Sequence, residues 1–147
     1  MKSFFQNNQL LIYSTAVLTM FVCVVVGVFL LVEQQNIEET YYEDGTLERK
    51  NYYRSNESLE KVEFYSTKGA LVQVAYYKPN GTTLKFVEVF SDDGILQFKN
   101  YYRADNTSER FEEYRADGTL ASVTYTDTNG TSETEYYDAK GNLIPVE

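Results

Sequence analysis

Residues 71–90 read LVQVAYYKPNGTTLKFVEVF and contain one complete unit of a pattern that recurs along the chain. Its two runs of seven residues, Leu71–Tyr77 and Leu84–Phe90, are rich in valine, tyrosine and phenylalanine, which are typical of β-strands. The short segment between them contains proline, asparagine and Gly81, a composition typical of a tight turn. Because so short a connection joins antiparallel neighbours, the stretch predicts a β-hairpin.

The hairpin recurs along the rest of the chain with a period of about twelve residues. Seven glycines mark successive turns: Gly45, Gly69, Gly81, Gly94, Gly118, Gly130 and Gly141. Two intervals of 24 residues each hide one further unit, with Glu57 and Asn106 at their midpoints. An aromatic residue stands four positions before most turns, and a leucine follows most turns by two or three positions. Since asparagine tolerates the left-handed backbone region, we expect Asn56 and Asn106 to replace glycine.

These units predict an all-β antiparallel meander of about nine strands over residues 41–147. Neither face of the expected strands is wholly apolar, which argues against a thick two-layer sandwich. We therefore expect an elongated, largely single-layer sheet in which neighbouring strands stabilise each other, as in a solenoid. A curled sheet that packs one face on itself is the alternative. Residues 33–40 are expected to be a linker.

The N-terminal part of the chain is of another kind. Residues 10–32 form an apolar run of 23 residues without a charge. As a helix this run would be about 34 Å long, enough to cross a hydrocarbon core of about 30 Å. We therefore expect a transmembrane helix. A cleaved signal peptide is one alternative, although the run exceeds the usual apolar core of such peptides; a lipid-modified Cys23 is another, although Val22 precedes it where a small residue is expected.

Charge predicts the orientation of this helix. Residues 1–9 carry one charged side chain, Lys2, whereas residues 33–147 carry all 22 acidic and 12 of the 13 basic side chains. The positive-inside rule places residues 1–9 in the cytoplasm and residues 33–147 outside the cell. The expected location is therefore the cell membrane, with a single span. The acidic excess of the outer part argues against nucleic acid as a partner.

The chain has few residues that support catalysis or metal binding. It contains no histidine, the commonest general base and metal ligand, and one cysteine, which cannot form an intrachain disulfide. Adjacent carboxylates such as Glu112 and Glu113 point to opposite faces of a strand, which disfavours a shared glycosidase-type site. We expect no catalytic residue, no cofactor and no metal. A carboxylate-dependent glycan hydrolase is the remaining enzymatic alternative.

Tyrosine is the remaining candidate for function. Tyrosine is enriched at protein interfaces, although rows of tyrosine are also typical of cross-strand packing in a thin sheet. Where two tyrosines are adjacent, the two-residue period of a strand places one ring on each face. The candidate contact surface comprises Tyr52, Tyr53, Tyr76, Tyr77, Tyr101, Tyr102, Tyr136 and Tyr137.

Two units resemble known repeat families. The segment YDAKGNL at residues 137–143 resembles the Y-D-x-x-G-R-L core of Rhs/YD repeats, with Asn142 in place of arginine. The segment YYEDGTL at residues 41–47 resembles the MORN-variant repeats of the bacterial YwqK family. The resemblance extends over residues 41–147 and implies a bacterial β-hairpin repeat module used for contact. The resemblance to the YwqK family also implies an antitoxin or immunity factor.

The function hypothesis combines these observations. We expect a non-enzymatic, single-pass membrane protein that presents an acidic, tyrosine-rich β-repeat module outside the cell. There it would bind a protein or a cell-envelope component, or serve as a subunit of a membrane complex. An immunity or antitoxin-like protein of a toxin system is the alternative. The expected partners are the membrane, through the single span, and an unidentified protein or envelope component.

Overall fold

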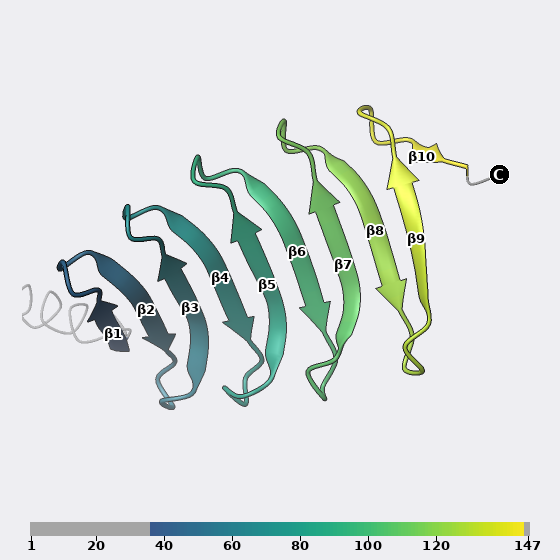
Figure 1. Cartoon of the computed structure of the whole chain (residues 1–147). Helices are drawn as coiled ribbons and strands as arrows, with labels where there is room; N and C mark the ends of the chain where they lie inside the picture. Colours follow the sequence, from purple (N-terminus) through teal and green to yellow (C-terminus); the bar gives the residue numbers. More distant parts are fainter. Residues whose placement is uncertain (1–35, 146–147) are drawn as a thin grey trace, which may run out of the picture. The chain divides into compact units, whose positions relative to one another are not determined.

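The computed structural model describes residues 36–145, which form one open antiparallel sheet (Figure 1). The expected transmembrane helix at residues 10–32 lies outside the described residues. Within residues 36–145 there is no helix of the length and apolarity that a membrane crossing requires.

Ten strands follow one another in space in the order of the chain. They are β1 (Asn36–Tyr41), β2 (Leu47–Tyr53), β3 (Leu59–Tyr65), β4 (Leu71–Tyr77), β5 (Leu84–Phe90), β6 (Leu96–Tyr102), β7 (Ser108–Tyr114), β8 (Leu120–Thr126), β9 (Ser132–Tyr137) and β10 (Leu143–Ile144). Each strand pairs antiparallel with the next, which confirms the expected meander. The expected count was about nine, because the pattern of turns did not include the first strand. The sheet stays open, so the alternative of a sheet packed on itself is wrong (Figure 1).

The first strand extends the sheet into residues 36–40, which the twelve-residue pattern leaves in the linker. Its side chains are tied to β2. Lys50 Nζ lies 2.8 Å from a carboxylate oxygen of Glu39, and Asn51 Nδ2 donates to Glu38 over 3.0 Å. These contacts hold β1 against β2. The repeat pattern does not indicate β1, because no glycine-marked turn precedes it.

The turns are tight and take the left-handed backbone at their glycine. In the first turn, the Gly45 N–H donates to the Tyr42 carbonyl oxygen over 3.0 Å, and the Tyr42 N–H donates to Thr46 over 2.8 Å. All seven glycines of the repeat have φ between 70° and 86°. The pairing of the strands shifts by one residue beside seven of the nine turns, as a β-bulge.

The two turns without glycine place different residues at the left-handed position. Asn106 takes the left-handed position with φ 64°, which confirms the expectation for this residue. The expectation for Asn56 is wrong, because Glu57 occupies the left-handed position with φ 63°. Asn56 instead accepts hydrogen bonds through Oδ1 from the N–H and the hydroxyl of Ser58, over 3.1 and 2.7 Å. Its side chain therefore closes the turn, as aspartate does at Asp44.

The aromatic and leucine positions of the repeat meet across seven of the nine hairpins. Tyr41 lies opposite Leu47, Tyr65 opposite Leu71, and the exceptional Ser108 opposite Tyr102. The aromatic position before a turn and the leucine position after it are therefore cross-strand neighbours. Each such pair contributes about 0.2–1 kcal/mol in a typical sheet.

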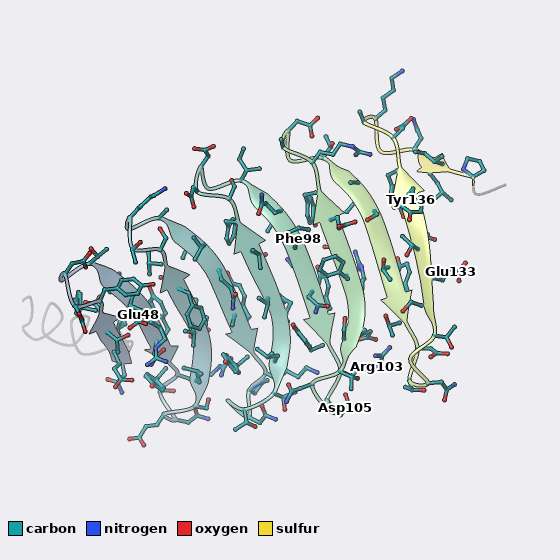
Figure 2. The ribbon with its side chains drawn as sticks, in the orientation of Figure 1. Glu48, Phe98, Arg103, Asp105, Glu133 and Tyr136 are labelled. Carbon is teal, nitrogen blue, oxygen red and sulfur yellow. The ribbon has the colours of Figure 1, made fainter. Side chains whose placement is uncertain are left out.

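Residues that lie opposite each other on antiparallel strands project to the same face, so the register divides the side chains into two faces. Figure 2 draws these side chains along the sheet. One face carries the row described below, and we call it the aromatic face. The opposite face is apolar at its centre, where Val62 and Ala75 are each 4% exposed and the rings of Phe98 and Phe111 stack at 5.6 Å. Within residues 36–145 the sheet is a single layer, so each buried side chain is covered by its neighbours on the same face.

Candidate functional site

Seven side chains form one continuous row across the aromatic face, one from each strand between β2 and β8. The row consists of Tyr52, Lys61, Tyr76, Phe86, Tyr101, Arg110 and Tyr125, each directly opposite the next. We call it the aromatic row. It places five rings and two cations in register without a break.

The members of the aromatic row contact one another through their ring faces. Lys61 Nζ lies 4.0 Å from the centroid of the Tyr52 ring, and Arg110 Cζ lies 5.0 Å from that of Tyr101. The Phe86 ring has its centroid 4.4 Å from that of Tyr76 and 5.7 Å from that of Tyr101. Aromatic and cation–π contacts at such distances are attractive. The inner rings therefore stabilise the sheet while they remain half-exposed.

A second row on the same face carries alternating charges and runs beside the aromatic row. It consists of Glu39, Lys50, Glu63, Val74, Glu88, Lys99, Glu112, Val123 and Glu135. Lys99 Nζ lies 2.9 Å from a carboxylate oxygen of Glu88, and the two side chains are mostly buried. Opposite charges on adjacent strands attract, so this charged row favours the observed register.

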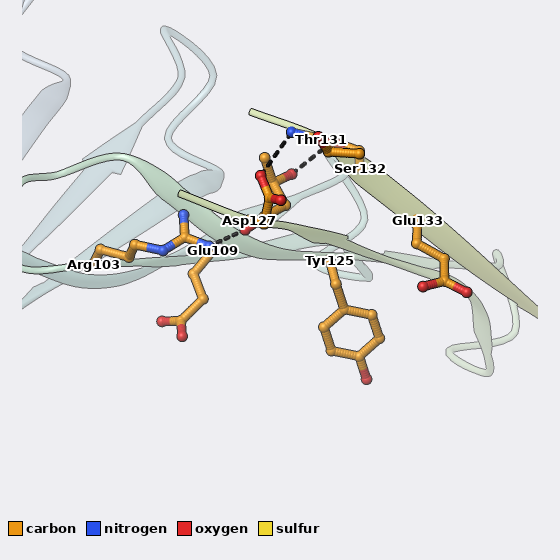
Figure 3. A pocket seen from close by; sticks show the side chains of 8 residues that line it. Arg103, Glu109, Tyr125, Asp127, Thr131, Ser132 and Glu133 are labelled. Atoms are coloured by element: carbon orange, nitrogen blue, oxygen red, sulfur yellow. Dashed lines mark hydrogen bonds between the residues drawn. The ribbon is translucent and has the colours of Figure 1, made fainter. Parts of the chain in front are cut away.

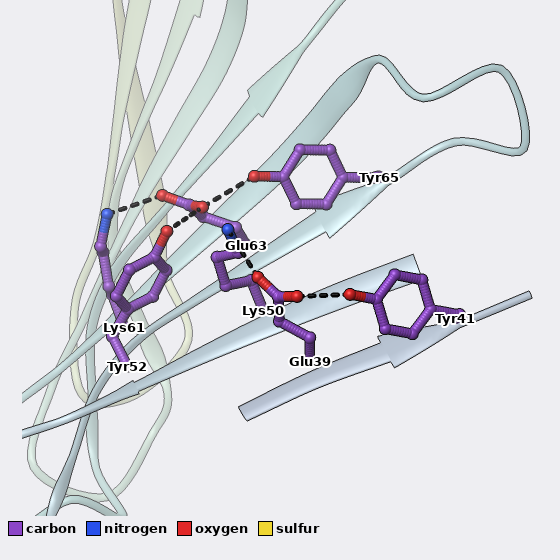
Figure 4. Close-up of polar contacts among 7 residues, drawn as sticks. All are labelled: Glu39, Tyr41, Lys50, Tyr52, Lys61, Glu63 and Tyr65. Atoms are coloured by element: carbon purple, nitrogen blue, oxygen red, sulfur yellow. Dashed lines mark hydrogen bonds and ion pairs between the residues drawn. The ribbon is translucent and has the colours of Figure 1, made fainter. Parts of the chain in front are cut away.

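Glu63 is the hub of the polar contacts in the first half of the sheet (Figure 4). Its carboxylate accepts hydrogen bonds from the hydroxyls of Tyr52 and Tyr65, over 2.7 and 2.8 Å, and lies 2.6 Å from Lys61 Nζ. Burial disfavours the charged carboxylate, but the three donors outweigh burial and hold the pKa of Glu63 below its ordinary value. Burial and the bond to Glu63 raise the pKa of Tyr65 to about 12 and also raise that of Tyr52.

The second half of the sheet repeats this hub at Glu112. Only 3% of Glu112 is exposed, and its carboxylate accepts from the Tyr114 hydroxyl over 2.7 Å and pairs with Arg110. Burial, followed by the hydrogen bond to Glu112, raises the pKa of Tyr114. Both hubs thus combine a carboxylate with a cation and a neutral phenol.

The two hubs belong to a larger repeat of four strands that the twelve-residue period conceals. Equivalent positions lie 49 residues apart, as in Tyr52 and Tyr101, Lys61 and Arg110, Glu63 and Glu112, and Val74 and Val123. The signal in the sequence is the pentapeptide KNYYR, which occurs at residues 50–54 and again at 99–103. The two turns without glycine, at Glu57 and Asn106, are also 49 residues apart. Strands β1–β4 and β5–β8 are therefore two copies of one unit.

The eight tyrosines expected to form the contact surface are divided between the faces. The register and the alternation along each strand place Tyr52, Tyr76, Tyr101 and Tyr137 on the aromatic face, and Tyr53, Tyr77, Tyr102 and Tyr136 on the opposite face. Each pair thus offers one ring to each face, as expected. Tyr125 was left out of the expected set but belongs to the aromatic row. It stands one position early in its unit, and the pairing of β8 with β9 lacks the usual register shift.

Basic side chains fasten the turns along one edge of the sheet, and the twelve-residue pattern does not indicate these contacts. Arg54 donates to the Tyr77 carbonyl oxygen over 2.9 Å, and Lys78 donates to that of Tyr102 over 3.1 Å. Arg103 donates in the same way to Thr126. Each side chain spans from one turn to the next turn on that edge. The signal was a basic residue directly after three of the tyrosine pairs.

A cavity of about 350 Å³ opens where the aromatic row ends (Figure 3). It lies among β7, β8, β9 and the turn between β8 and β9. Its lining includes Arg103, Glu109, Tyr125, Asp127 and Glu133. Among the described residues, no group of three or more aspartate, glutamate, cysteine or histidine side chains is placed to hold a metal ion.

Comparisons with known proteins address the fold alone. No family model matches the chain, and no curated protein matches it. The chain is similar to a structure of the GtfA/B complex bound to UDP and GlcNAc, with a TM-score of 0.52 and 13% identity over 72% of this chain and 24% of that one. It is also similar to an S. aureus TarM variant in complex with fondaparinux, α-GlcNAc-glycerol and UDP, with a TM-score of 0.52 and 15% identity over 74% of this chain and 21% of that one.

These two similarities place the sheet among known folds and do not extend to function. This chain spans a quarter or less of either protein. The resemblance to Rhs/YD and YwqK-family repeats stays a prediction, as do the membrane span and its orientation. What the described residues establish is an open β-meander of repeated hairpins with an ordered aromatic face.

Proposed function

We propose that the chain is a non-enzymatic, single-pass membrane protein that presents the β-meander outside the cell as a binding module. The observation that supports this proposal is the aromatic face, where a row of half-exposed rings runs in register beside a row of charged side chains. Within residues 36–145 no second layer covers them (Figure 2). Tyrosine and arginine are the residue types that protein interfaces favour.

The rigidity of this face suits binding. The rings of Tyr76 and Phe86 hold each other at 4.4 Å, and Lys61 is held between the Tyr52 ring and the Glu63 carboxylate. Side chains that are already ordered lose less conformational entropy when a partner docks. The partner in this proposal is a protein or a component of the cell envelope, or the other subunits of a membrane complex.

The anchor in this proposal is the apolar run at residues 10–32, with Lys2 on its cytoplasmic side. Protease added to intact cells tests the orientation. A tag at the C-terminus should be removed from intact cells, whereas a tag at the N-terminus should be protected until the membrane is opened. Protection of both tags would contradict the proposal.

Photocrosslinking of the full chain in cells tests the binding function. A photoreactive phenylalanine analogue replaces Tyr101 on the aromatic face, and a matched variant carries it in place of Tyr102 on the opposite face. We expect position 101 to give a discrete crosslinked product that position 102 does not give. No discrete product from either position would contradict a binding function.

A further inference from the structure

Tyr125 ends the aromatic row and is its most exposed ring, with 44% of the residue accessible. Its ring forms part of the wall of the 350 Å³ cavity. The carboxylates of Glu109 on β7 and Glu133 on β9 project from the sheet in the same direction as this ring (Figure 3). The cavity thus joins an aromatic surface to two carboxylates.

Elsewhere in this chain, an aromatic ring and a carboxylate hold a cation between them at three places. Lys61 lies against the Tyr52 ring at 4.0 Å and pairs with Glu63 at 2.6 Å. Lys99 lies against the Phe86 ring at 4.2 Å and pairs with Glu88 at 2.9 Å. Arg110 lies against the Tyr101 ring and pairs with Glu112. In each case a cation lies between a ring and a carboxylate.

At Tyr125 no cation occupies the corresponding position on β9, and Arg110, which lies opposite Tyr125 on β7, is engaged by the Tyr101 ring and by Glu112. The residue opposite Tyr52 is Lys61 and the residue opposite Tyr101 is Arg110, but the residue opposite Tyr125 on β9 is Glu133. Neither Glu109 nor Glu133 has an ion-pair partner within the described part of the chain.

The guanidinium in the cavity wall does not fill the gap. Arg103 donates to the carbonyl oxygens of Ser108 and Thr126 and is thereby held at the turn. Asp127 is also engaged, because its carboxylate accepts from the N–H groups of Asn129 and Thr131 over 2.8 Å. Three carboxylates against one guanidinium leave the cavity with an acidic balance.

We propose that this cavity receives the side chain of a lysine or arginine from a protein partner. This inference rests on the proposed binding function and assigns it a site and a chemistry. A protein is the source that the surroundings favour, because a large apolar side chain is exposed on the same face at the same end of the sheet. It is Leu143, which lies opposite Tyr137 and is 56% exposed. A protein surface that supplies the cation can cover this side chain as well.

The test uses the full chain in detergent and fluorescently labelled trilysine, triarginine and triglutamate peptides, with binding followed by fluorescence anisotropy. We expect saturable binding of one or both cationic peptides and none of triglutamate. Glu133→Gln and Tyr125→Ala should each weaken that binding on the order of five-fold or more. The matched control is Glu48→Gln, which removes the same charge from an exposed position on β2 and should leave the affinity unchanged.

A second variant fills the cavity from within the chain. Glu133→Lys places an ammonium opposite Tyr125, as Lys61 lies opposite Tyr52. It should abolish binding of the cationic peptides and raise the thermal midpoint of unfolding, so that loss of binding is not confused with loss of the fold.

Two outcomes would overturn the assignment of the cavity. One is an absence of saturable peptide binding by the unmodified chain. The other is equal weakening by Glu133→Gln and Glu48→Gln, which would mean that the peptides respond to the overall acidity of the module. Crosslinks from position 101 together with either outcome would leave the binding function standing and reject this site alone.

Discussion

Tyr52 and Tyr101 lie 49 residues apart and occupy equivalent places in two successive four-strand units, each with a cation against its ring. The protein therefore repeats on two scales. The turns recur about every twelve residues and define the strands of the meander. The pattern of aromatic and charged side chains on the aromatic face recurs every four strands. The cavity beside Tyr125 lies where the aromatic row ends, since the next position across the sheet, on β9, is occupied by Glu133.

The hub at Glu63 makes stability depend on acid. Because the folded pKa of this carboxyl is lowered from 4.5, its contribution is present above pH 4.5 and is lost as the pH falls through the folded value. At pH 7, Glu63→Gln should lower the free energy of unfolding by about 1–2 kcal/mol. Urea unfolding at several pH values should show this difference shrinking between pH 5 and pH 3. A difference that stays constant down to pH 3 would be inconsistent with the hub.

The raised pKa of Tyr65 makes stability depend on alkali as well. The hydroxyl is neutral in the folded state up to about pH 12, whereas an unfolded tyrosine ionises near 10.0. Its contribution is therefore fully present below pH 10 and is lost as the pH rises through the folded value. The tyrosinate absorbance of the chain, with that of Tyr65→Phe subtracted, should titrate near 12. A subtracted titration centred at 10 would contradict the bond to Glu63.

Arg54 fastens the turn after β2 to the end of β4. Arg54→Ala removes the donor to the Tyr77 carbonyl oxygen and to that of Leu59, and should lower the free energy of unfolding by about 1–2 kcal/mol. Urea unfolding measures the loss. The matched control is Lys140→Ala in an exposed turn, which should change stability by less than about 0.5 kcal/mol. Equal effects of the two variants would mean that the clamp adds nothing.

Gly81 lies where a side chain has no room. A Cβ at this position would lie 2.8 Å from the Leu59 backbone nitrogen, whereas a Cβ at Gly45 would have no atom within 4 Å. Both glycines have positive φ, so Gly45→Ala should lose about 1 kcal/mol through backbone strain alone. Gly81→Ala should lose at least twice as much in the same urea assay. Equal losses would exclude the close approach of the two turns.

Replacement by glycine should stabilise the protein at Glu57 but not at Asn106. Glu57→Gly relieves a left-handed backbone and should raise the free energy of unfolding by about 0.5–1 kcal/mol. Asn106→Gly relieves the same strain, but it removes the side-chain oxygen that accepts the Leu84 N–H over 2.8 Å, and should therefore give no gain. Thermal unfolding of both variants checks this. An equal gain in both would show that the Asn106 contact contributes nothing.

Three features could be predicted from the residue pattern alone: the meander, the places of its turns and the presentation of one tyrosine of each pair to each face. These features are local, because a glycine in a three-residue loop and the two-residue alternation of a strand act within a few positions. The leucine slot followed in the same way, since Tyr41 and Leu47 meet across a single turn.

The grouping of side chains into rows could not be predicted in this way, because it depends on the pairing between strands. A bulge beside seven of the nine turns shifts the pairing by one residue, and one shift changes which residues lie opposite each other across a whole strand. The register thus joined Tyr125 to the aromatic row and set Glu133 opposite its ring. The hydrogen bonds of Arg54 and Arg103 likewise join turns about 23 residues apart. The twelve-residue pattern does not indicate which side chains contact each other over that separation.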